Sequence, residues 1–283
     1  MKNLTDGYIL ASGKLLPCVG YGTWRVPEGE ICRNGVRTAL EAGYRHFDTA
    51  AIYKNERSVG EGIRLSGIPR EEVFLTSKLW NTDQGKERTL AAFELSLKKL
   101  GTDYLDLYLI HWPVAYAYKD EYPRHLIESW RIMEELYRDG RIRSIGVSNF
   151  LPHHMETLLQ EAKIMPMVNQ IELHPGCLQP EAVMYCKGRG IVLEAWSPLC
   201  QGRRFDKPSI AKAAAAHGKT PAQVMLRWSL QMGFVPLPKS VTPQRIVENT
   251  RIFDFELTEA EMKAIGRSLM SSRMGPHPDH AKF

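Results

Sequence analysis

Eight short apolar runs alternate with longer amphipathic stretches along this chain, and that alternation restricts its fold more than any other feature. The runs predict β-strands at residues 19–22, 45–48, 73–77, 104–111, 144–147, 168–171, 191–196 and 234–236. Strands that alternate with helices pair in parallel through right-handed crossovers, and eight such units close into a barrel. The sequence therefore predicts an α/β fold, a (β/α)8 TIM barrel, in which residues 1–283 form one domain.

The stretches between the runs predict helices over 33–41, 87–100, 125–137 and 180–187, and one that begins at Pro221 and continues through Trp228. At the N-terminus, residues 8–16 predict a β-hairpin that caps one end of the barrel. The tail over 271–283 contains Gly275, Pro276 and Pro278. We expect this substrate-side tail to be non-helical and to lie over a surface.

A doubly wound open sheet is the structural alternative. Such a sheet would need a G-x-G-x-x-G turn after an early strand, and the chain has none. The nearest match, Gly20-Tyr21-Gly22, lacks the third glycine and a following helix.

Composition excludes several classes of protein. No run approaches the about 18 apolar residues that span a bilayer, and the segment 1–17 does not resemble a signal peptide. The five cysteines are an odd number without a C-x-x-C pair, which favours reduced thiols. The net charge of +5 is scattered and forms no basic, aromatic-laced stripe. We expect a cytoplasmic, monomeric protein with no nucleic-acid or membrane partner.

Four chemically active residues, Asp48, Tyr53, Lys78 and His111, lie at or after the ends of three of the predicted strands. In a barrel of this kind the carboxyl ends of the strands meet at one mouth, where catalysis occurs. A free phenol has a pKa of about 10, and a neighbouring ammonium favours the phenolate and lowers that pKa. We expect Lys78 to lower the pKa of Tyr53, with Asp48 holding the ammonium. His111 would polarise a bound carbonyl oxygen. Singly, each residue could instead be a cap, a surface charge or a packed core group.

Six motifs carry a resemblance to a known family. They are Gly43-Tyr-Arg-His-Phe-Asp-Thr-Ala-Ala-Ile-Tyr53-Lys-Asn-Glu56, Lys78-Leu-Trp-Asn81, Asp106-Leu-Tyr-Leu-Ile-His-Trp-Pro113, Gly146-Val-Ser-Asn-Phe150, Asn169-Gln-Ile-Glu-Leu-His-Pro175 and Lys239-Ser-Val-Thr-Pro-Gln-Arg-Ile-Val-Glu-Asn249. In this order they resemble the aldo-keto reductase family over nearly the whole chain. The ending Gly275-Pro-His-Pro-Asp279 is similar to the prokaryotic branch that contains diketogluconate and methylglyoxal reductases.

The resemblance implies a (β/α)8 barrel that transfers a hydride from NADPH to an aldehyde or ketone. In the family's pattern Asp48, Tyr53, Lys78 and His111 are the catalytic tetrad, and Tyr53 protonates the oxygen. The resemblance also implies a set of cofactor contacts: Gly22, Thr23, Ser148, Asn149, Gln170, Trp196, Ser197, Leu199, Lys239, Ser240, Val241, Thr242, Arg245, Glu248 and Asn249. Among them, Lys239 and Arg245 favour NADPH over NADH, because cations suit a 2′-phosphate.

The expected partner is a small-molecule carbonyl substrate, bound by Trp24, Trp80, His111 and Trp112 at the strand ends. We predict no metal site. The adjacent His153 and His154 are expected to point to different sides of a helix, and no acidic or cysteine partner has ligand spacing to them or to His174.

Two other functions stay open at this level. A cofactor-binding redox sensor could keep the same barrel with little turnover. A barrel isomerase or sugar-phosphate lyase could bind phosphate after the last strands, where Lys239 and Ser240 occur.

Overall fold

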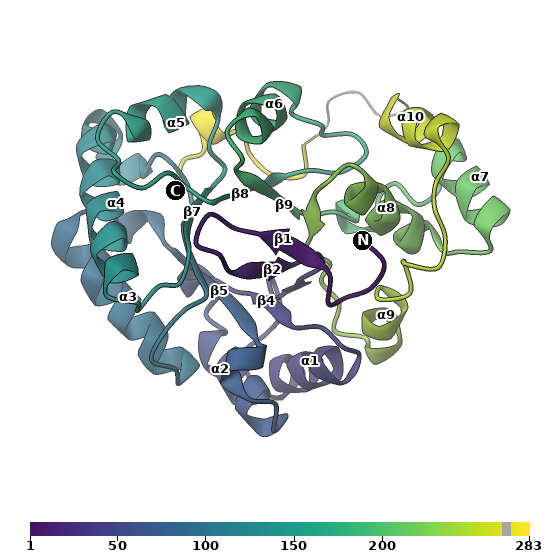
Figure 1. Ribbon diagram of the computed structural model, residues 1–283, viewed down its shortest axis with the longest axis horizontal. Helices are drawn as coiled ribbons and strands as arrows, with labels where there is room; N and C mark the ends of the chain where they lie inside the picture. The colour runs from purple at the N-terminus through teal and green to yellow at the C-terminus, as the bar shows by residue number, and fades with distance from the viewer. Residues whose placement is uncertain (268–272) are drawn as a thin grey trace.

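Eight parallel strands form the centre of the molecule, and helices surround them (Figure 1). The computed structural model describes residues 1–267 and 273–283. In sheet order the strands are β3 (Tyr21–Gly22), β4 (His46–Asp48), β5 (Phe74–Leu79), β6 (Leu107–Ile110), β7 (Ile145–Ser148), β8 (Val168–Glu172), β9 (Val192–Trp196) and β10 (Val235–Pro236). Each pairs in parallel with the next.

Backbone hydrogen bonds close the sheet into a barrel. The amide N–H groups of Gly20 and Gly22 each donate at 3.0 Å to the carbonyl oxygens of Pro236 and Pro238, which joins β3 to the segment of β10. Gly22 lies so near this segment that a Cβ would sit 2.9 Å from the Leu237 carbonyl oxygen. The predicted (β/α)8 barrel is thereby confirmed.

The strands are apolar runs because both of their faces are covered. Every residue of β4, β5, β6, β7 and β8 is buried. Parallel strands that have helices outside and packed side chains inside need apolar residues on both faces. Strands with one face exposed to solvent do not. The predicted strand positions agree with the structure, except that Lys78 lies within β5 and does not follow it.

The helices are α1 (Glu30–Glu41), α2 (Glu56–Leu65), α3 (Lys86–Leu100), α4 (Tyr122–Arg138), α5 (Pro152–Leu159), α6 (Pro180–Gly188), α7 (Pro208–His217), α8 (Pro221–Gln231), α9 (Pro243–Glu248) and α10 (Glu259–Arg267). The five predicted helices correspond to α1, α3, α4, α6 and α8. The apolar spacing did not predict α2, whose interior contains Gly60 and Gly62. Both glycines permit close packing, because a Cβ at Gly60 would collide with the Leu100 carbonyl of α3 and one at Gly62 would lie 2.8 Å from Val36 of α1.

The two ends of the chain lie at the two ends of the barrel. The predicted hairpin is confirmed as β1 (Gly7–Ile9) and β2 (Leu15–Pro17), which Figure 1 shows across the near end of the barrel. Its Ser12 hydroxyl lies 2.8 Å from that of Ser144, just before β7, so the hairpin covers the amino ends of the strands. The C-terminal tail, here residues 273–283, lies at the carboxyl ends. It contains the 3-10 turn η6 (Pro278–His280), which corrects the expectation of a wholly non-helical tail; residues 271 and 272 of that expectation lie outside the described residues.

Candidate active site

A buried ion pair and a tyrosine hydroxyl form the centre of the site. The Lys78 ammonium donates to Oδ1 of Asp48 at 2.7 Å and to the carbonyl oxygen of Thr49 at 2.9 Å. Its third contact is the hydroxyl of Tyr53, at 3.3 Å. Asp48 is the last residue of β4, Lys78 is in β5, and Tyr53 ends the short 3-10 helix η1 (Ala51–Tyr53). The β4–β5 register and the turn after β4 therefore bring the three groups together.

Burial and the ion pair act on the pKa values in opposite directions. Burial is the largest effect and disfavours the Lys78 cation, but Asp48 and Tyr53 together outweigh it through charge and hydrogen bonds, so the pKa of Lys78 is raised. For Tyr53 burial is the largest effect and raises the pKa, while the nearby Lys78 charge lowers it by less. The expectation that Lys78 would bring the pKa of Tyr53 below its usual value is wrong for the protein without ligands, because desolvation of the phenolate prevails.

His111 faces the same group of side chains. It follows β6 directly, its ring centroid lies 5.7 Å from that of Tyr53, and burial together with the Lys78 charge lowers its pKa well below the usual value. The ring is therefore neutral at physiological pH. Among the described residues its Nδ1 has no hydrogen-bond partner. A neutral imidazole beside a phenol can donate one hydrogen bond to a substrate oxygen without adding a charge.

Amide and indole groups lie next to the tetrad at the ends of β7, β8 and β9. Asn149 donates through Nδ2 to the His111 carbonyl oxygen at 3.0 Å and accepts at its Oδ1 from the Trp196 indole N–H at 2.9 Å. The Ser148 hydroxyl donates to the Gln170 carbonyl oxygen at 2.7 Å. Four of the predicted cofactor residues thus form one connected hydrogen-bonded group beside His111.

Glu194 is a member of this site that the sequence analysis missed. It lies in β9, is fully buried, and accepts from Nε2 of Gln170 at 2.8 Å. The same nitrogen donates to Oδ2 of Asp48 at 2.8 Å. Glu194 and Gln170 lie opposite each other on the neighbouring strands β9 and β8, whereas the bond from Gln170 to Asp48 of β4 crosses the barrel interior. A lone acidic residue in an apolar strand was the available signal, because a charge is rarely placed there without a partner.

The basic segment after β10 contains the predicted phosphate-binding residues. Lys239 and Arg245 are exposed, whereas Ser240 is buried. The Ser240 carbonyl oxygen accepts a hydrogen bond from the Tyr21 hydroxyl at 2.6 Å. Burial and the charge of Arg25 lower the pKa of Lys239. Lys239 and Arg25 are two cations that repel each other at an exposed position, and such a position is suited to an anionic ligand.

The other predicted residues of this segment are placed along the start and end of α9. Thr242 is its N-cap and donates its N–H to the Ser240 hydroxyl at 3.0 Å, beside the exposed Val241. The Glu248 carboxylate accepts from the Thr220 hydroxyl at 2.6 Å, and Asn249 is buried at the C-cap. None of these contacts joins the segment to the tetrad, so a ligand would have to bridge the two parts.

Four further predicted cofactor residues lie close to the ends of β3 and β9. Thr23 donates both its N–H and its hydroxyl to the Asp48 carbonyl oxygen, at 3.0 and 2.8 Å, next to Gly22. Ser197 follows Trp196 in the left-handed region, with φ of 53°, and Leu199 comes before a 3-10 turn. The chain therefore turns away sharply from the end of β9.

Aromatic rings gather over His111, and the end of the chain contributes one of them. The Trp80 ring centroid lies 5.2 Å from that of His111, and the Phe283 ring stacks on Trp80 at 5.5 Å. Phe283 also meets the edge of the nearly buried Trp112 at 5.0 Å. Its carbonyl oxygen accepts from Asn81 Nδ2 at 2.9 Å. Sequence spacing could not have indicated Phe283. Trp24, by contrast, is 43% exposed on the loop after β3, where the Arg25 guanidinium lies 4.3 Å from its ring centroid.

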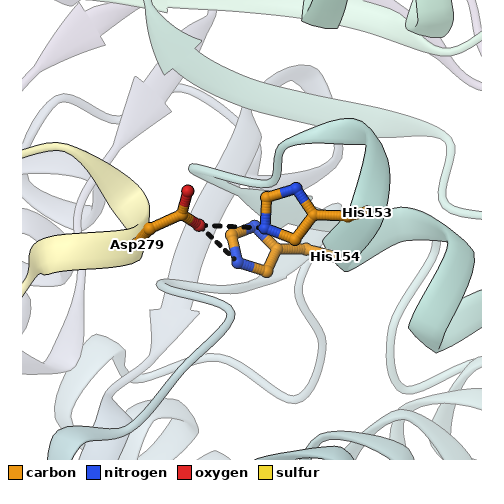
Figure 2. A group of neighbouring side chains, drawn as sticks. All are labelled: His153, His154 and Asp279. Atoms are coloured by element: carbon orange, nitrogen blue, oxygen red, sulfur yellow. Dashed lines mark hydrogen bonds and ion pairs between the residues drawn. The ribbon is translucent and has the colours of Figure 1, made fainter.

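A histidine cluster corrects one premise of the sequence analysis. Figure 2 shows His153 and His154 of α5 side by side, both directed at Asp279 of the tail. Their Nε2 atoms lie 2.9 and 3.1 Å from Oδ1 of Asp279. The two histidines therefore do not point to different sides, and an acidic partner is present, although it is distant in sequence. Their ligand atoms all lie within 4.8 Å of one another.

The hydrogen bonds of His154 favour a clamp over a metal site. Its Nδ1 accepts from the Leu151 N–H at 3.2 Å, so the neutral ring carries its proton on Nε2 and donates it to Asp279. Burial and the neighbouring His153 lower the pKa of His154 to about 4, which keeps that ring neutral. A metal ion would need the Nε2 lone pair that this tautomer lacks. We call His153, His154 and Asp279 the tail clamp.

Fold and site together define a class. An eight-stranded parallel barrel that holds a lysine–carboxylate pair against a tyrosine hydroxyl at the carboxyl ends of its strands is a barrel enzyme equipped for proton transfer. The chain belongs to the aldo/keto reductase family, whose model matches residues 19–269. It is therefore an oxidoreductase.

Named relatives agree with this assignment. The chain is 52% identical over 281 residues to glyoxal reductase of Bacillus subtilis, covering 99% of each chain. It is 44% identical over 272 residues to methylglyoxal reductase of Escherichia coli, covering 95% of this chain and 96% of the relative. Among solved structures, the Bombyx mori aldo-keto reductase in complex with NADP has a TM-score of 0.87 and 37% identity, and covers 96% of this chain and 95% of that one. The resemblance to the prokaryotic branch is confirmed.

The length and hydropathy of the helices bear on membranes. Within residues 1–267 and 273–283, no helix is both long enough and apolar enough to cross a bilayer.

Proposed function

We propose that this protein reduces aldehydes and ketones to alcohols with NADPH, and that small aldehydes, dicarbonyls or keto sugars are its substrates. The observation that carries the proposal is the contact of the Tyr53 hydroxyl with Lys78, which is itself held by Asp48. That arrangement holds a half-buried proton donor against a buried cation and carboxylate.

The residues present fit a nicotinamide cofactor. Both hydrogens of the Gln170 amide are used by carboxylates, so its carbonyl oxygen remains as an acceptor for a carboxamide N–H. Asn149 and Ser148 lie beside it, and Trp196 offers a ring at the end of β9. Lys239 and Arg245 offer cations for phosphate at the exposed end. When bound, NADPH would supply the hydride that reduces the carbonyl carbon.

The side chains of the tetrad have separate tasks in this proposal. The neutral His111 ring orients the substrate oxygen toward Tyr53. As negative charge grows on that oxygen, Tyr53 gives up its proton and Lys78 stabilises the phenolate that forms. Asp48 keeps the ammonium in place. The raised pKa of Tyr53 suits this direction of transfer, because the phenol stays protonated until the charge develops.

The substrate side is proposed to be aromatic. Trp80, Trp112 and Phe283 surround His111, and such walls with a few polar groups are typical of small-ligand sites. The relatives named above are reductases of glyoxal and methylglyoxal, which supports a small dicarbonyl as the substrate.

The test is NADPH oxidation with a panel that contains glyoxal, methylglyoxal, a nitrobenzaldehyde and a keto sugar, run in parallel with NADH. We expect turnover with at least one dicarbonyl and a preference for NADPH. Tight NADPH binding without turnover over the whole panel would support the redox-sensor alternative. Failure to bind NADPH, measured by quenching of protein fluorescence, would support a different barrel reaction.

A further inference from the structure

Glu194 occupies an unusual place in the barrel. It is fully buried inside an otherwise apolar strand. One oxygen, Oε2, accepts from the Gln170 amide at 2.8 Å, and the other, Oε1, lies 3.4 Å from Nε2 of the buried His46. Among the described residues, Oε1 has no hydrogen-bond partner. A buried acid that only filled space would make the protein less stable than an apolar residue of the same size. The polar contacts of Glu194 therefore need an explanation.

The two carboxylates fix the orientation of the Gln170 amide. Nε2 of Gln170 lies 2.8 Å from Oδ2 of Asp48 and 2.8 Å from Oε2 of Glu194. Both neighbours are oxygen acceptors, so only the NH2 end can face them, and each takes one of its hydrogens. A flipped amide would set its carbonyl oxygen against two oxygens. With Asp48 alone, one hydrogen of the amide would be unpaired, and one hydrogen bond instead of two would hold the side chain.

Glu194 can make both contacts as an uncharged acid. Burial raises its pKa to about 8, and the Asp48 charge adds to this effect. The facing His46 is neutral, since burial and the Lys78 charge lower its pKa to about 3. A proton on Oε1 would face Nε2 of His46 across 3.4 Å, while Oε2 accepts from Gln170. The acid accordingly places no second negative charge beside the Asp48–Lys78 pair.

We propose that Glu194 is a positioning residue for hydride transfer: through Gln170 it fixes the acceptor oxygen that faces the nicotinamide carboxamide, and it holds Gln170 on Asp48. The inference rests on the proposed function, since it requires a nicotinamide at Gln170. Glu194 does not touch the substrate or the reacting atoms in this arrangement.

Two variants separate this role from simple packing. Glu194→Gln keeps an oxygen that accepts from Gln170 and an N–H donor for His46. Glu194→Leu has a similar size but offers neither. For each we would measure kcat, KM and the dissociation constant of NADPH, and also that of adenosine 2′,5′-bisphosphate, a cofactor fragment without nicotinamide. Thermal melting would show that each variant is folded.

We expect Glu194→Leu to lower kcat by about tenfold and to raise the dissociation constant of NADPH by about threefold or more, because a preorganised contact is lost. The fragment should bind as in the parent protein. Glu194→Gln should recover most of the loss. On a Gln170→Ala background, Glu194→Leu should add little, because its effect passes through Gln170.

Several results would overturn the inference. One is an equal effect of Glu194→Leu on the binding of NADPH and of the fragment. Another is a Glu194→Leu variant whose kcat and NADPH binding match those of the parent protein. The third is full additivity of Glu194→Leu with Gln170→Ala. If Glu194→Leu does not fold, a loss in Glu194→Gln as large as that of Gln170→Ala would overturn it as well. Failure of the proposed function is distinct, since the parent protein itself would then neither bind NADPH nor reduce carbonyls.

Discussion

At the scale of single residues, the proposed chemistry depends on one buried ion pair, Lys78 and Asp48. The Lys78 ammonium has three oxygen neighbours, and one of them is the Tyr53 hydroxyl. Such a cation keeps its charge in the interior because Asp48 and Tyr53 together offset desolvation. Burial, helped by the same cation, keeps His111 neutral. Burial is also the largest effect on Tyr53, and the Lys78 charge opposes it in part.

Removing the Tyr53 hydroxyl tests its role as proton donor. We expect Tyr53→Phe to lower kcat by about 100-fold or more, because a general acid contributes on this order. The dissociation constant for NADPH should stay within about twofold, since the ring is retained. Steady-state kinetics and fluorescence titration measure the two quantities. Near-normal turnover would remove Tyr53 from this role.

Arg245 tests the preference for NADPH. The side chain is exposed near Lys239, where a 2′-phosphate would bind in the proposed complex. Arg245→Met should weaken NADPH by about 10- to 100-fold, the effect of one charge-assisted hydrogen bond to phosphate. NADH, which lacks that phosphate, should change by less than about twofold. Equal losses for the two cofactors would contradict this assignment.

At the scale of elements, close packing of α2 against its neighbours explains a helix that propensity argues against. Glycine costs about 1 kcal/mol in a helix interior relative to alanine, yet α2 contains Gly60 and Gly62. Both positions leave no room for a Cβ. Tertiary packing has therefore overridden local preference, which is why the sequence alone did not show this helix.

Gly60 and Gly188 form a matched pair for this explanation. Gly60→Ala should destabilise the protein by about 1–3 kcal/mol, because the added methyl collides with the backbone of α3. Gly188 is the last residue of α6, and a Cβ there meets no atom within 4 Å. Gly188→Ala should leave stability unchanged or raise it by up to about 1 kcal/mol. Urea denaturation of both variants gives the comparison, and equal effects would refute the packing argument.

The tail clamp offers a second test at this scale. Asp279 ties the tail to α5 (Figure 2). Four residues later, Phe283 stacks on Trp80. We expect Asp279→Ala to raise KM for the aldehyde by about fivefold, the equivalent of ~1 kcal/mol, with a smaller effect on kcat. Asp279→Asn keeps an acceptor oxygen for His154 and serves as the control. An unchanged KM in Asp279→Ala would show that Phe283 stays in place without the clamp.

At the scale of the whole molecule, the barrel interior is polar at the level of the site, and that polarity links stability to pH. Glu194 faces Asp48, Lys78 and His46 inside the barrel, and burial raises its pKa to about 8. An unfolded glutamate loses its proton near pH 4.3. Between these values the folded state binds more protons than the unfolded state. On account of this group, the free energy of unfolding should therefore fall as pH rises from about 5 to 8.

Glu194→Gln isolates that contribution. The amide does not titrate, so the difference in unfolding free energy between variant and parent should shift in favour of the variant as pH rises through this range. Below about pH 4 Glu194 is uncharged in both the folded and the unfolded parent protein, so the difference in unfolding free energy should be constant. Urea unfolding at pH 5, 6, 7 and 8 measures it. A difference that does not vary with pH would mean that Glu194 is already ionised in the folded protein.

The sequence by itself determined the parallel barrel, because strands buried on both faces must be apolar and their alternation with amphipathic stretches leaves few topologies. It also indicated Asp48, Tyr53, Lys78 and His111 as candidate site residues, and the structure brings these four together. The tertiary structure alone decided the net pKa of Tyr53, the contact of Glu194 with Gln170, and the placement of Phe283 and Asp279. The physical reason is the separation along the chain over which each effect acts. Periodicity records which face of a segment is buried, whereas desolvation and contacts between distant segments exist only once the barrel has closed and the tail has packed.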